Sequence, residues 1–304
     1  MQKICVIGGS RYFGKLLVER LLAAGHHVTV INRGSTRPPD GVEHLAVDRN
    51  DEAPLTAALG ARVFDVVVDQ VCYTPVQAAV AARVFAGRTR RYVMTSTIEV
   101  YDPATGAPPV GTPVAEESVD PAGWPVDLGL PWGDEAFRAA HYAEGKRQAE
   151  AVFTRAGFDF VAVRSAHVLG GGAREFTGRL AHYVERVAAG RAIVVHADAL
   201  PTVFVHYQEL ADLLRWAVEA DFTGPVNACS DGLLDVHDLI AAVAAQLGRE
   251  PVLRTVPAGE EASPFSFDRP YAMSNSRAKK LGYAFSRTTD WLPGAVAETV
   301  TTRQ

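Results

Sequence analysis

The chain has 304 residues, of which 48% are hydrophobic and 21% are charged, and its formal net charge is −5. This ordinary globular composition excludes a largely disordered protein, and the length suffices for one large α/β domain with a smaller partner. The net negative charge gives no broad electrostatic reason to bind nucleic acid or an anionic membrane, so we expect neither as a partner.

The first half of the chain alternates short β-branched runs with longer helical patterns, which is typical of a parallel, doubly wound sheet. The strands expected there cover residues 4–7, 28–31, 45–47, 63–69 and 91–95. A helix is expected at residues 14–24, directly after the first strand. Farther along, the pattern predicts strands at residues 160–164, 203–205 and 225–227, and helices at residues 134–156, 210–219, 236–247 and 292–300.

Residues 102–133 interrupt this pattern with a long segment rich in proline and glycine. Loops of this length in a compact domain are usually functional or disordered, and we interpret this one as bordering the active site; a surface insertion without a role is the alternative. The predicted fold is α/β: a Rossmann domain with a doubly wound parallel sheet and a smaller C-terminal substrate-binding lobe. The Rossmann domain would cover residues 1–167, with residues 200–228 returning to it, and the lobe residues 168–199 and 229–304.

The cysteines Cys5, Cys72 and Cys229 lie far apart and form no CxxC pair. This spacing favours buried thiols in a reducing compartment over a disulfide framework or a metal site. The amino-terminal residues make a poor signal peptide, and no apolar run reaches the roughly 18–20 residues that a membrane span requires. We therefore expect a cytoplasmic protein without a bound metal.

A glycine-rich turn directly follows the first predicted strand and leads into the first predicted helix. In this context glycines allow a tight turn, and the N–H groups at the start of the helix can bind a pyrophosphate. Arg11 stands where the middle glycine of the usual motif would be, and a purely structural turn is the alternative. The residues expected to bind a dinucleotide are Gly8, Gly9, Ser10, Arg11, Tyr12, Phe13 and Gly14.

The end of the second strand bears on the type of dinucleotide. NAD-binding enzymes usually place an acidic residue there for the ribose 2′-hydroxyl, whereas this chain has Asn32 and Arg33. Arg33, with Arg11, can pair with a 2′-phosphate, so the sequence favours NADP(H) and leaves NAD(H) open. The alternative is that Arg33 is a solvated turn residue.

Tyr142 and Lys146 lie four residues apart in a predicted helix, so their side chains share one face of it. A tyrosine has an ordinary pKa of about 10, and a nearby ammonium favours its phenolate form. The pair can therefore serve in general acid–base catalysis. A YxxxK match alone is common by chance, and its place after the fifth strand of a Rossmann pattern gives it weight.

With these motifs the chain resembles the extended short-chain dehydrogenase/reductase family, which includes nucleotide-sugar epimerases, dehydratases and ketoreductases. The run TSTIEVY resembles the family's signature at strand five, which implies that Thr97 hydrogen-bonds the substrate oxygen. The resemblance also implies that Lys146 touches the nicotinamide ribose and that Asp48 contacts adenine. The segments that begin at Arg164 and Phe204 resemble two further family segments.

Two departures from the family pattern limit what the resemblance implies about the substrate. The turn GGSRYFG with NRG is closer to an atypical branch that includes poorly characterised reductases and chloroplast stem-loop RNA-binding proteins. The run STIEVY resembles the STDEVY of nucleotide-sugar 4,6-dehydratases, but Ile98 replaces the aspartate that would eliminate water. A 4,6-dehydratase is therefore disfavoured.

The candidate substrate-binding residues are Glu99, His167 and Arg269. Glu99 can instead be a simple strand-end carboxylate, and a buried histidine is more often a structural residue than a ligand, which applies to His167 and more strongly to His206. The assignment of Arg269 rests on analogy with related folds, in which an arginine near this place often binds a substrate phosphate.

These features predict an NADP(H)-dependent ketoreductase or epimerase that acts on a C–OH or C=O group of a polar, sugar-like small molecule, nucleotide-linked or free. Thr97, Tyr142 and Lys146 would assist hydride transfer. The alternative is a non-catalytic Rossmann protein of the atypical branch that senses NADP or binds RNA. The hypothesis of a hydrolase has less support still, since the chain has no GxSxG elbow. Whether the protein forms a homodimer stays open.

Overall fold

The computed structural model describes residues 1–101 and 112–302. The chain divides into two compact units. The first comprises Met1–Thr105, Glu116–Ser165 and Ala211–Asn227, and the second comprises Gly106–Ala115, Ala166–Leu210 and Ala228–Gln304.

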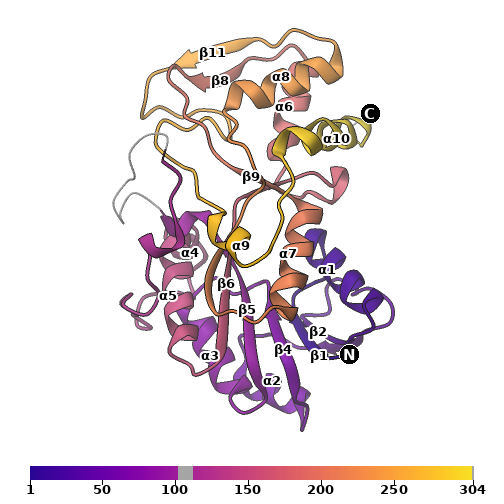
Figure 1. The fold of residues 1–304 in the computed structure, drawn as a ribbon. Helices are drawn as coiled ribbons and strands as arrows, with labels where there is room; N and C mark the ends of the chain where they lie inside the picture. The colour runs from indigo at the N-terminus through magenta and orange to yellow at the C-terminus, as the bar shows by residue number, and fades with distance from the viewer. Residues whose placement is uncertain (102–111, 303–304) are drawn as a thin grey trace. The chain divides into compact units, whose positions relative to one another are not determined.

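A seven-stranded sheet in the order β10-β6-β5-β4-β1-β2-β3 forms the centre of the first unit (Figure 1). Its strands are β1 (Lys3–Ile7), β2 (His27–Asn32), β3 (Glu43–Ala46), β4 (Phe64–Asp69), β5 (Thr89–Thr97), β6 (Asp159–Ser165) and β10 (Gly224–Ala228). The predicted doubly wound parallel sheet is confirmed. The strand order reverses between β1 and β4, and the crevice at the carboxyl ends of strands beside such a reversal is where α/β sheets bind ligands.

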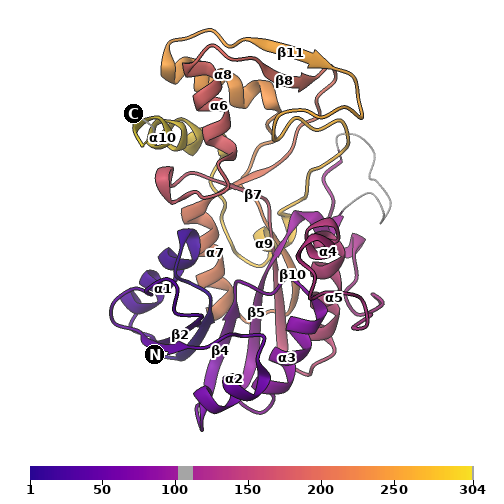
Figure 2. The same cartoon turned by 180° about the vertical axis from the view of Figure 1, so that it is seen from behind.

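Helices cover both faces of this sheet, as Figures 1 and 2 show. One face carries α2 (Glu52–Leu59), α3 (Pro75–Phe85) and α5 (Tyr142–Thr154). Their buried residues, such as Leu55, Phe85 and Phe153, form one apolar core with the strands. On the other face lie α1 (Tyr12–Ala23) and the part of α7 (Tyr207–Glu219) that belongs to this unit, joined by an Arg20–Asp212 ion pair of 2.5 Å.

The prediction of one continuous helix over residues 134–156 is wrong. The structure has a short helix α4 (Glu135–Ala140), then a break at His141, and then α5. The backbone of His141 leaves the helical range, with φ −115° and ψ 30°. The break makes Tyr142 the first residue of α5, which the apolar periodicity of the sequence does not reveal.

The second unit has an apolar core of its own, to which three helices and short strands contribute. Its helices are α6 (Arg179–Ala188), α8 (Val236–Leu247), α9 (Ser276–Lys280) and α10 (Thr288–Thr301), and its strands are β7 (His167–Leu169), β8 (Ile193–His196), β9 (Phe204–His206) and β11 (Leu253–Val256). The strands form two parallel pairs, β7 with β9 and β8 with β11. The strands β7, β8 and β11 were not predicted, because runs of three or four residues are too short to show a period. The ten-residue helix α6 and the short helix α9 were not predicted either.

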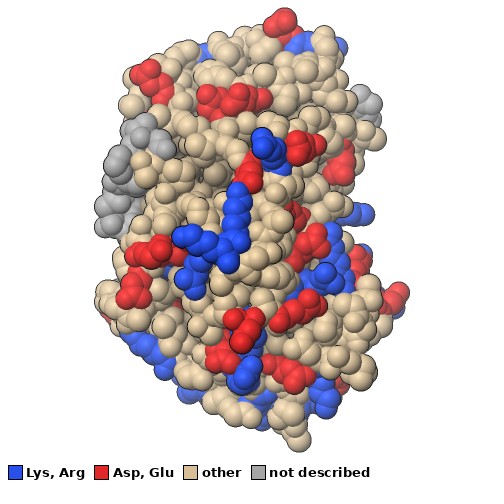
Figure 3. All heavy atoms as spheres, in the orientation of Figure 1, with Lys and Arg blue, Asp and Glu red and all other residues tan. Residues whose placement is uncertain are grey.

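Charged residues of both signs are interspersed over the face drawn in Figure 3, and neither sign covers a large continuous area. A small basic group lies over α9, which contains Arg277, Lys279 and Lys280. Asp231 pairs with Lys279 at 2.5 Å. Within the described parts of the chain, no helix combines the length and the apolar character that crossing a membrane would require.

A buried ion pair holds α5 against the sheet. Glu150 of α5 and Arg164 of β6 are both fully buried and lie 2.7 Å apart. Arg164 also donates hydrogen bonds to the hydroxyl of Tyr101 at 2.9 Å and to two backbone oxygens at 3.0 and 2.9 Å. Ser96 of β5 donates to the same Glu150 carboxylate at 2.5 Å. Because every donor of the guanidinium has an acceptor, the pair offsets much of the cost of burying two charges.

Replacing Glu150 with leucine is expected to lower the free energy of unfolding by about 3–5 kcal/mol, because Arg164 would remain as an uncompensated buried charge. Urea denaturation of the single variants and of Glu150→Leu/Arg164→Met measures the effect. The double variant should lose less than the sum of the two single losses. The exposed pair Arg37–Asp40 is the control, and Asp40→Asn should leave the urea midpoint unchanged. Additive losses at the buried pair would contradict this interpretation.

Candidate functional site

The glycine-rich turn between β1 and α1 has a backbone that requires glycine. Gly8 and Gly9 have φ values of 97° and 75°, in the left-handed region that disfavours other residues. A Cβ on Gly9 would also lie 2.9 Å from side-chain carbons of Val6 and Val18. The N-cap residue Arg11 makes no side-chain capping hydrogen bond to α1, and N–H groups at the start of a helix can bind a phosphate.

The side chain of Gln70 completes this turn from the neighbouring strand. Gln70 follows β4, and its backbone N–H donates to Ile7 at 3.0 Å across the reversal of the sheet. A Cβ on Gly14 would overlap its Oε1 atom, so Gly14 leaves room for the Gln70 amide. The buried Nε2 of Gln70 has no hydrogen-bond partner among the described residues. The turn leaves no room for side chains at Gly9 and Gly14, and the Gln70 donor beside it is unsatisfied. These two features fit the pyrophosphate of a dinucleotide.

The side-chain amide of Asn32, at the end of β2, makes all its hydrogen bonds to groups of the protein. Its Nδ2 donates to the hydroxyl of Ser10 at 2.7 Å and to the carbonyl of Thr36 at 3.1 Å. Its Oδ1 accepts from Gly34 N–H at 2.7 Å and lies 2.9 Å from Nε2 of His44. The amide therefore fixes the loops on either side and has no capacity left for a ribose hydroxyl.

The two arginines near this strand end are exposed. Arg11 reaches toward the loop after β2, where its Nη2 donates to the hydroxyl of Thr36 at 3.3 Å. Arg33 lies in the same loop and is also exposed. Both residues belong to the segments that the Asn32 side chain joins through Ser10 and Thr36.

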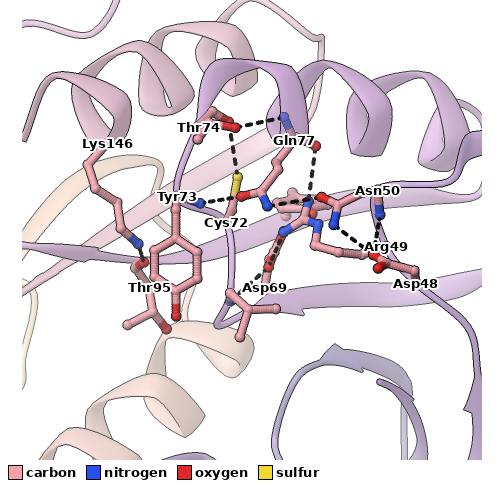
Figure 4. Close-up of polar contacts among 12 residues, drawn as sticks. Asp48, Arg49, Asn50, Asp69, Cys72, Tyr73, Thr74, Gln77, Thr95 and Lys146 are labelled. Carbon is pink, nitrogen blue, oxygen red and sulfur yellow. Dashed lines mark hydrogen bonds and ion pairs between the residues drawn. The ribbon is translucent and has the colours of Figure 1, made fainter. Parts of the chain in front are cut away.

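A hydrogen-bond chain runs from Asp48 toward α3, as Figure 4 shows. Asp48 accepts from the backbone and the side chain of Asn50 at 2.9 and 2.7 Å. Oδ1 of Asn50 accepts from Nε2 of Gln77 at 2.9 Å, and Oε1 of Gln77 accepts from the backbone N–H of Tyr73 at 2.7 Å. This chain orders the segment between β4 and α3.

A second buried ion pair lies beneath this segment. Nη1 of Arg49 contacts both carboxylate oxygens of Asp69, at 2.8 and 2.6 Å, and the hydroxyl of Tyr92 donates to the same carboxylate at 2.7 Å. Asp69 is the last residue of β4 and is fully buried. The pair fixes the carboxyl end of β4 beside that of β1.

Lys146 is the most unusual ionisable group of this site. Only 2% of it is exposed, and its ammonium donates to the backbone carbonyl of Thr95 at 2.9 Å. Burial lowers the pKa of Lys146 to about 8, because desolvation disfavours the charged form. Its ammonium lies 5.8 Å from the ring centre of Tyr142 and 4.7 Å from that of Tyr73.

The structure places the predicted catalytic residues in one unit. Tyr142 is half-buried in the first turn of α5, one turn before Lys146. Thr97 ends β5, is 9% exposed, and accepts a hydrogen bond from Glu99 N–H at 3.2 Å. Glu99 follows in the short 3-10 helix Ile98–Tyr101 and is half-buried. Tyr101 does not compete with Tyr142 for the acid–base role, since its hydroxyl is bound to Asn227 and Arg164.

The described part of the long loop, residues 112–133, is anchored on α5 where it passes Trp124 and Asp127. The indole of Trp124 donates to Glu144 at 3.0 Å, and its ring lies 4.9 Å from the guanidinium of Arg147. The backbone N–H of Asp127 donates to Gln148 at 2.8 Å. The loop thus contacts the helix that carries Tyr142 and Lys146; residues 102–111 of the predicted loop lie outside the described residues.

Two of the predicted substrate-binding residues belong to the second unit. His167 is buried among the rings of Phe204, Phe265, Phe267 and Tyr271, with centroid distances of 5.2–5.9 Å. Burial lowers the pKa of His167 to about 3, so its imidazole is neutral near pH 7, and its Nε2 has no partner among the described residues. The guanidinium of Arg269 lies 4.8 Å from the ring centre of Tyr271.

Sequence reasoning missed Gln70 and Tyr73, which follow β4. The signal that would have drawn attention to them is topological. In a doubly wound sheet the strand after the third lies next to the first, so the residues after its carboxyl end face the glycine-rich turn. The strand now named β4 was predicted from its sequence, but its place beside β1 was not.

A family model described as NAD(P)H-binding matches residues 8–186, which is more than half of the chain. The chain belongs to this NAD(P)H-binding family. The match contains the glycine-rich turn, Thr97, Tyr142 and Lys146, and together with the fold it confirms the expected resemblance to extended short-chain dehydrogenases/reductases.

Among curated proteins, the chain is similar to 2′-dehydrokanamycin reductase of Streptomyces kanamyceticus, with 34% identity over 149 residues. The aligned region covers 48% of this chain and spans 40% of the length of that reductase. Two solved structures share the fold. The Bordetella bronchiseptica enzyme WbmH, in complex with NAD+, has a TM-score of 0.72 and 20% identity over 99% of this chain and 98% of its own. The Thermus thermophilus UDP-glucose 4-epimerase, in complex with NAD, has a TM-score of 0.66 and 19% identity with the same coverages.

Replacing Gly145 with alanine is expected to destabilise the protein by about 1–3 kcal/mol, because a Cβ there would overlap the carbonyl oxygen of Tyr73. Helix propensity alone predicts the opposite, a gain of up to about 1 kcal/mol. Urea denaturation distinguishes the two. Gly294 in α10 is the matched control, since its Cβ would meet nothing within 4 Å, and Gly294→Ala should stabilise. A gain in both variants would show that α5 and the Tyr73 segment are not in tight contact.

Proposed function

We propose that this protein is an NADP(H)-dependent reductase that acts on a carbonyl group of a polar, sugar-like substrate. The observation that carries the proposal is the buried Lys146 ammonium, hydrogen-bonded to β5 and one helical turn from Tyr142, in a member of the NAD(P)H-binding family. A lysine with only 2% exposure is costly to bury, and its place beside a tyrosine supports a catalytic role.

The proposed proton path uses groups of the first unit only. The nicotinamide, when bound, supplies or accepts a hydride. Tyr142 would give its hydroxyl proton to the substrate oxygen during reduction, and the Lys146 ammonium would stabilise the resulting phenolate. The hydroxyl of Thr97 would hydrogen-bond the same oxygen. Lys146 would also hold the ribose next to the nicotinamide.

A reductase is favoured over an epimerase by the comparison with curated proteins. The relative at 34% identity is named 2′-dehydrokanamycin reductase, whereas the epimerase named above shares 19% identity and supports only the fold. An epimerase regenerates its cofactor in each cycle, while a reductase consumes one reduced cofactor per product. The alternative of a non-catalytic protein that senses NADP or binds RNA is disfavoured by the joint presence of Thr97, Tyr142 and Lys146.

The cofactor preference for NADP(H) rests on the end of β2. The Asn32 amide is saturated by protein groups, so it offers nothing to a ribose hydroxyl and no negative charge that would repel a 2′-phosphate. Arg33 and Arg11 are exposed at the same edge and can make charge-assisted hydrogen bonds to that phosphate. Asp48 would face the adenine, in keeping with its place after β3.

The substrate contacts proposed for Glu99, His167 and Arg269 have different chemical characters. Glu99 can accept hydrogen bonds from sugar hydroxyls. A neutral His167 among aromatic rings suits the apolar face of a sugar ring together with one hydroxyl. Arg269 would bind a phosphate if the sugar is nucleotide-linked.

Tyr142→Phe is expected to keep the fold and cofactor affinity but to lower turnover by at least about 10²-fold, the usual scale for a general acid. Thr97→Ala should lose less, and Lys146→Met should weaken both turnover and cofactor binding. Turnover is measured as loss of NADPH absorbance with 2′-dehydrokanamycin and, separately, with a UDP-linked ketosugar. One NADPH consumed per product supports a reductase. A Phe variant with near wild-type turnover would disprove the assignment of Tyr142, and product formation without net NADPH consumption would indicate an epimerase.

Arg33→Ala is expected to weaken NADPH binding by about tenfold and to leave NADH binding nearly unchanged. One charge-assisted hydrogen bond contributes about 1.5–3 kcal/mol, and exposure to solvent brings the value to the lower end of that range. Calorimetric titration of both cofactors measures the change. Arg37→Ala is the matched control in the same loop, because Arg37 already pairs with Asp40 at 2.7 Å. Equal losses for both cofactors, or wild-type protein that binds NADH as tightly as NADPH, would contradict the assignment.

A further inference from the structure

Tyr73 contacts the catalytic pair from a segment that the proposed mechanism does not use. Its ring centre lies 4.7 Å from the Lys146 ammonium and 6.3 Å from the ring of Tyr142. The ammonium is thus nearer to Tyr73 than to Tyr142, whose ring centre lies at 5.8 Å. Figure 4 shows the Tyr73 ring beside the Lys146 side chain. Tyr73 is 41% exposed, so packing in the core does not explain why its ring lies against a buried cation.

The backbone of Tyr73 is held firmly on both sides. Its N–H donates to Oε1 of Gln77 at 2.7 Å, and Gln77 is in turn bound to Asn50 at 2.9 Å. Its carbonyl oxygen packs against Gly145, where a Cβ would overlap it. Thr74 caps the N-terminus of α3 by accepting from Gln77 N–H at 3.2 Å. These contacts join the segment to α5 at the residue directly before Lys146.

The charge on Lys146 needs partners because its surroundings are desolvated. Its hydrogen-bond acceptor among the described residues is the carbonyl of Thr95 at 2.9 Å. The nearby ionisable groups that favour the charged form are Asp69 at the end of β4, Cys72 in the segment after it and Glu150 on α5, whereas Arg49 opposes it. An aromatic ring face within about 6 Å attracts an ammonium, most strongly where water is excluded.

We propose that Tyr73 is a positioning residue of the proton-transfer site: its ring face binds the Lys146 ammonium and holds it beside Tyr142. The contact itself is independent of the reaction, and its role in proton transfer rests on the proposed function. The ring rather than the hydroxyl carries the interaction, so phenylalanine should replace Tyr73 and an aliphatic residue should not.

The chain has only five lysines, Lys3, Lys15, Lys146, Lys279 and Lys280, so NMR of protein labelled with carbon-13 lysine can follow each of them. The Lys146 signal is assigned by its loss in Lys146→Met. In the wild-type protein the ring current of Tyr73 should move its ε protons upfield, and the signal should titrate with a pKa of about 8. Tyr73→Phe should preserve both properties. Tyr73→Leu should lose the upfield displacement and lower the pKa by about one unit, a tenfold shift toward the neutral amine, because the ring favours the charged form.

The matched control is Val76→Ala, an exposed change three residues along the chain, which should leave the Lys146 signal unchanged. Tyr73→Met serves as a second aliphatic replacement if Tyr73→Leu does not fold, as judged by its thermal melting curve. The proposal would be overturned if the Lys146 signal were unchanged in the aliphatic variant. It would also be overturned if Tyr73→Phe changed that signal as much as the aliphatic variant does. The NMR measurements use the protein without cofactor, so they test the contact between Tyr73 and Lys146 alone. The NADPH titration and the turnover assay of Tyr142→Phe test the proposed function, which can fail while this contact stands.

Discussion

The buried pair of Glu150 and Arg164 determines how the catalytic helix meets the sheet. Glu150 lies one turn after Lys146 on α5 and binds Arg164 of β6 at 2.7 Å and Ser96 of β5 at 2.5 Å. Ser96 stands between Thr95, whose carbonyl accepts from Lys146, and Thr97. One carboxylate therefore sets the position of the helix relative to both strands. A buried charge of this kind tolerates little displacement, because any shift leaves it unsatisfied.

The cofactor end of the first unit depends on a different constraint, the close approach of β1 and β4. The residues after these strands share a small volume in which Gly9 and Gly14 have no room for a Cβ. The Asp69–Arg49 pair holds the end of β4, and Asn32 ties the turn to the loop after β2. Side-chain amides and buried ions thus shape a turn whose glycines contribute no side chains of their own.

The proton-transfer site combines these two constraints. Lys146 is held from β5 by a carbonyl and, in our proposal, from the segment after β4 by the ring of Tyr73. The same segment is linked through Gln77 and Asn50 to Asp48, where the adenine end of the cofactor is expected. Groups that would contact opposite ends of a dinucleotide therefore share one hydrogen-bonded framework. This explains how a half-exposed tyrosine can keep a fixed place beside the lysine.

The sequence by itself determined the elements whose signals are local. Alternating β-branched runs and helical periods predicted the doubly wound sheet, and a glycine-rich turn between strand and helix predicted the dinucleotide site. The spacing of Tyr142 and Lys146 placed both on one helical face, because helical geometry depends only on residue separation. These features could be read without knowing which distant segments meet.

Only the tertiary structure decided which groups surround these residues. The saturation of the Asn32 amide, the partner of Arg164 and the place of Tyr73 depend on contacts between different segments of the chain, such as those of Tyr73 and Lys146. Local propensity carries no information about such contacts, since their energy comes from burial and from neighbours that the fold brings together. Tyrosine and glutamate occur on many surfaces, and only the neighbouring cations Lys146 and Arg164 give Tyr73 and Glu150 a role.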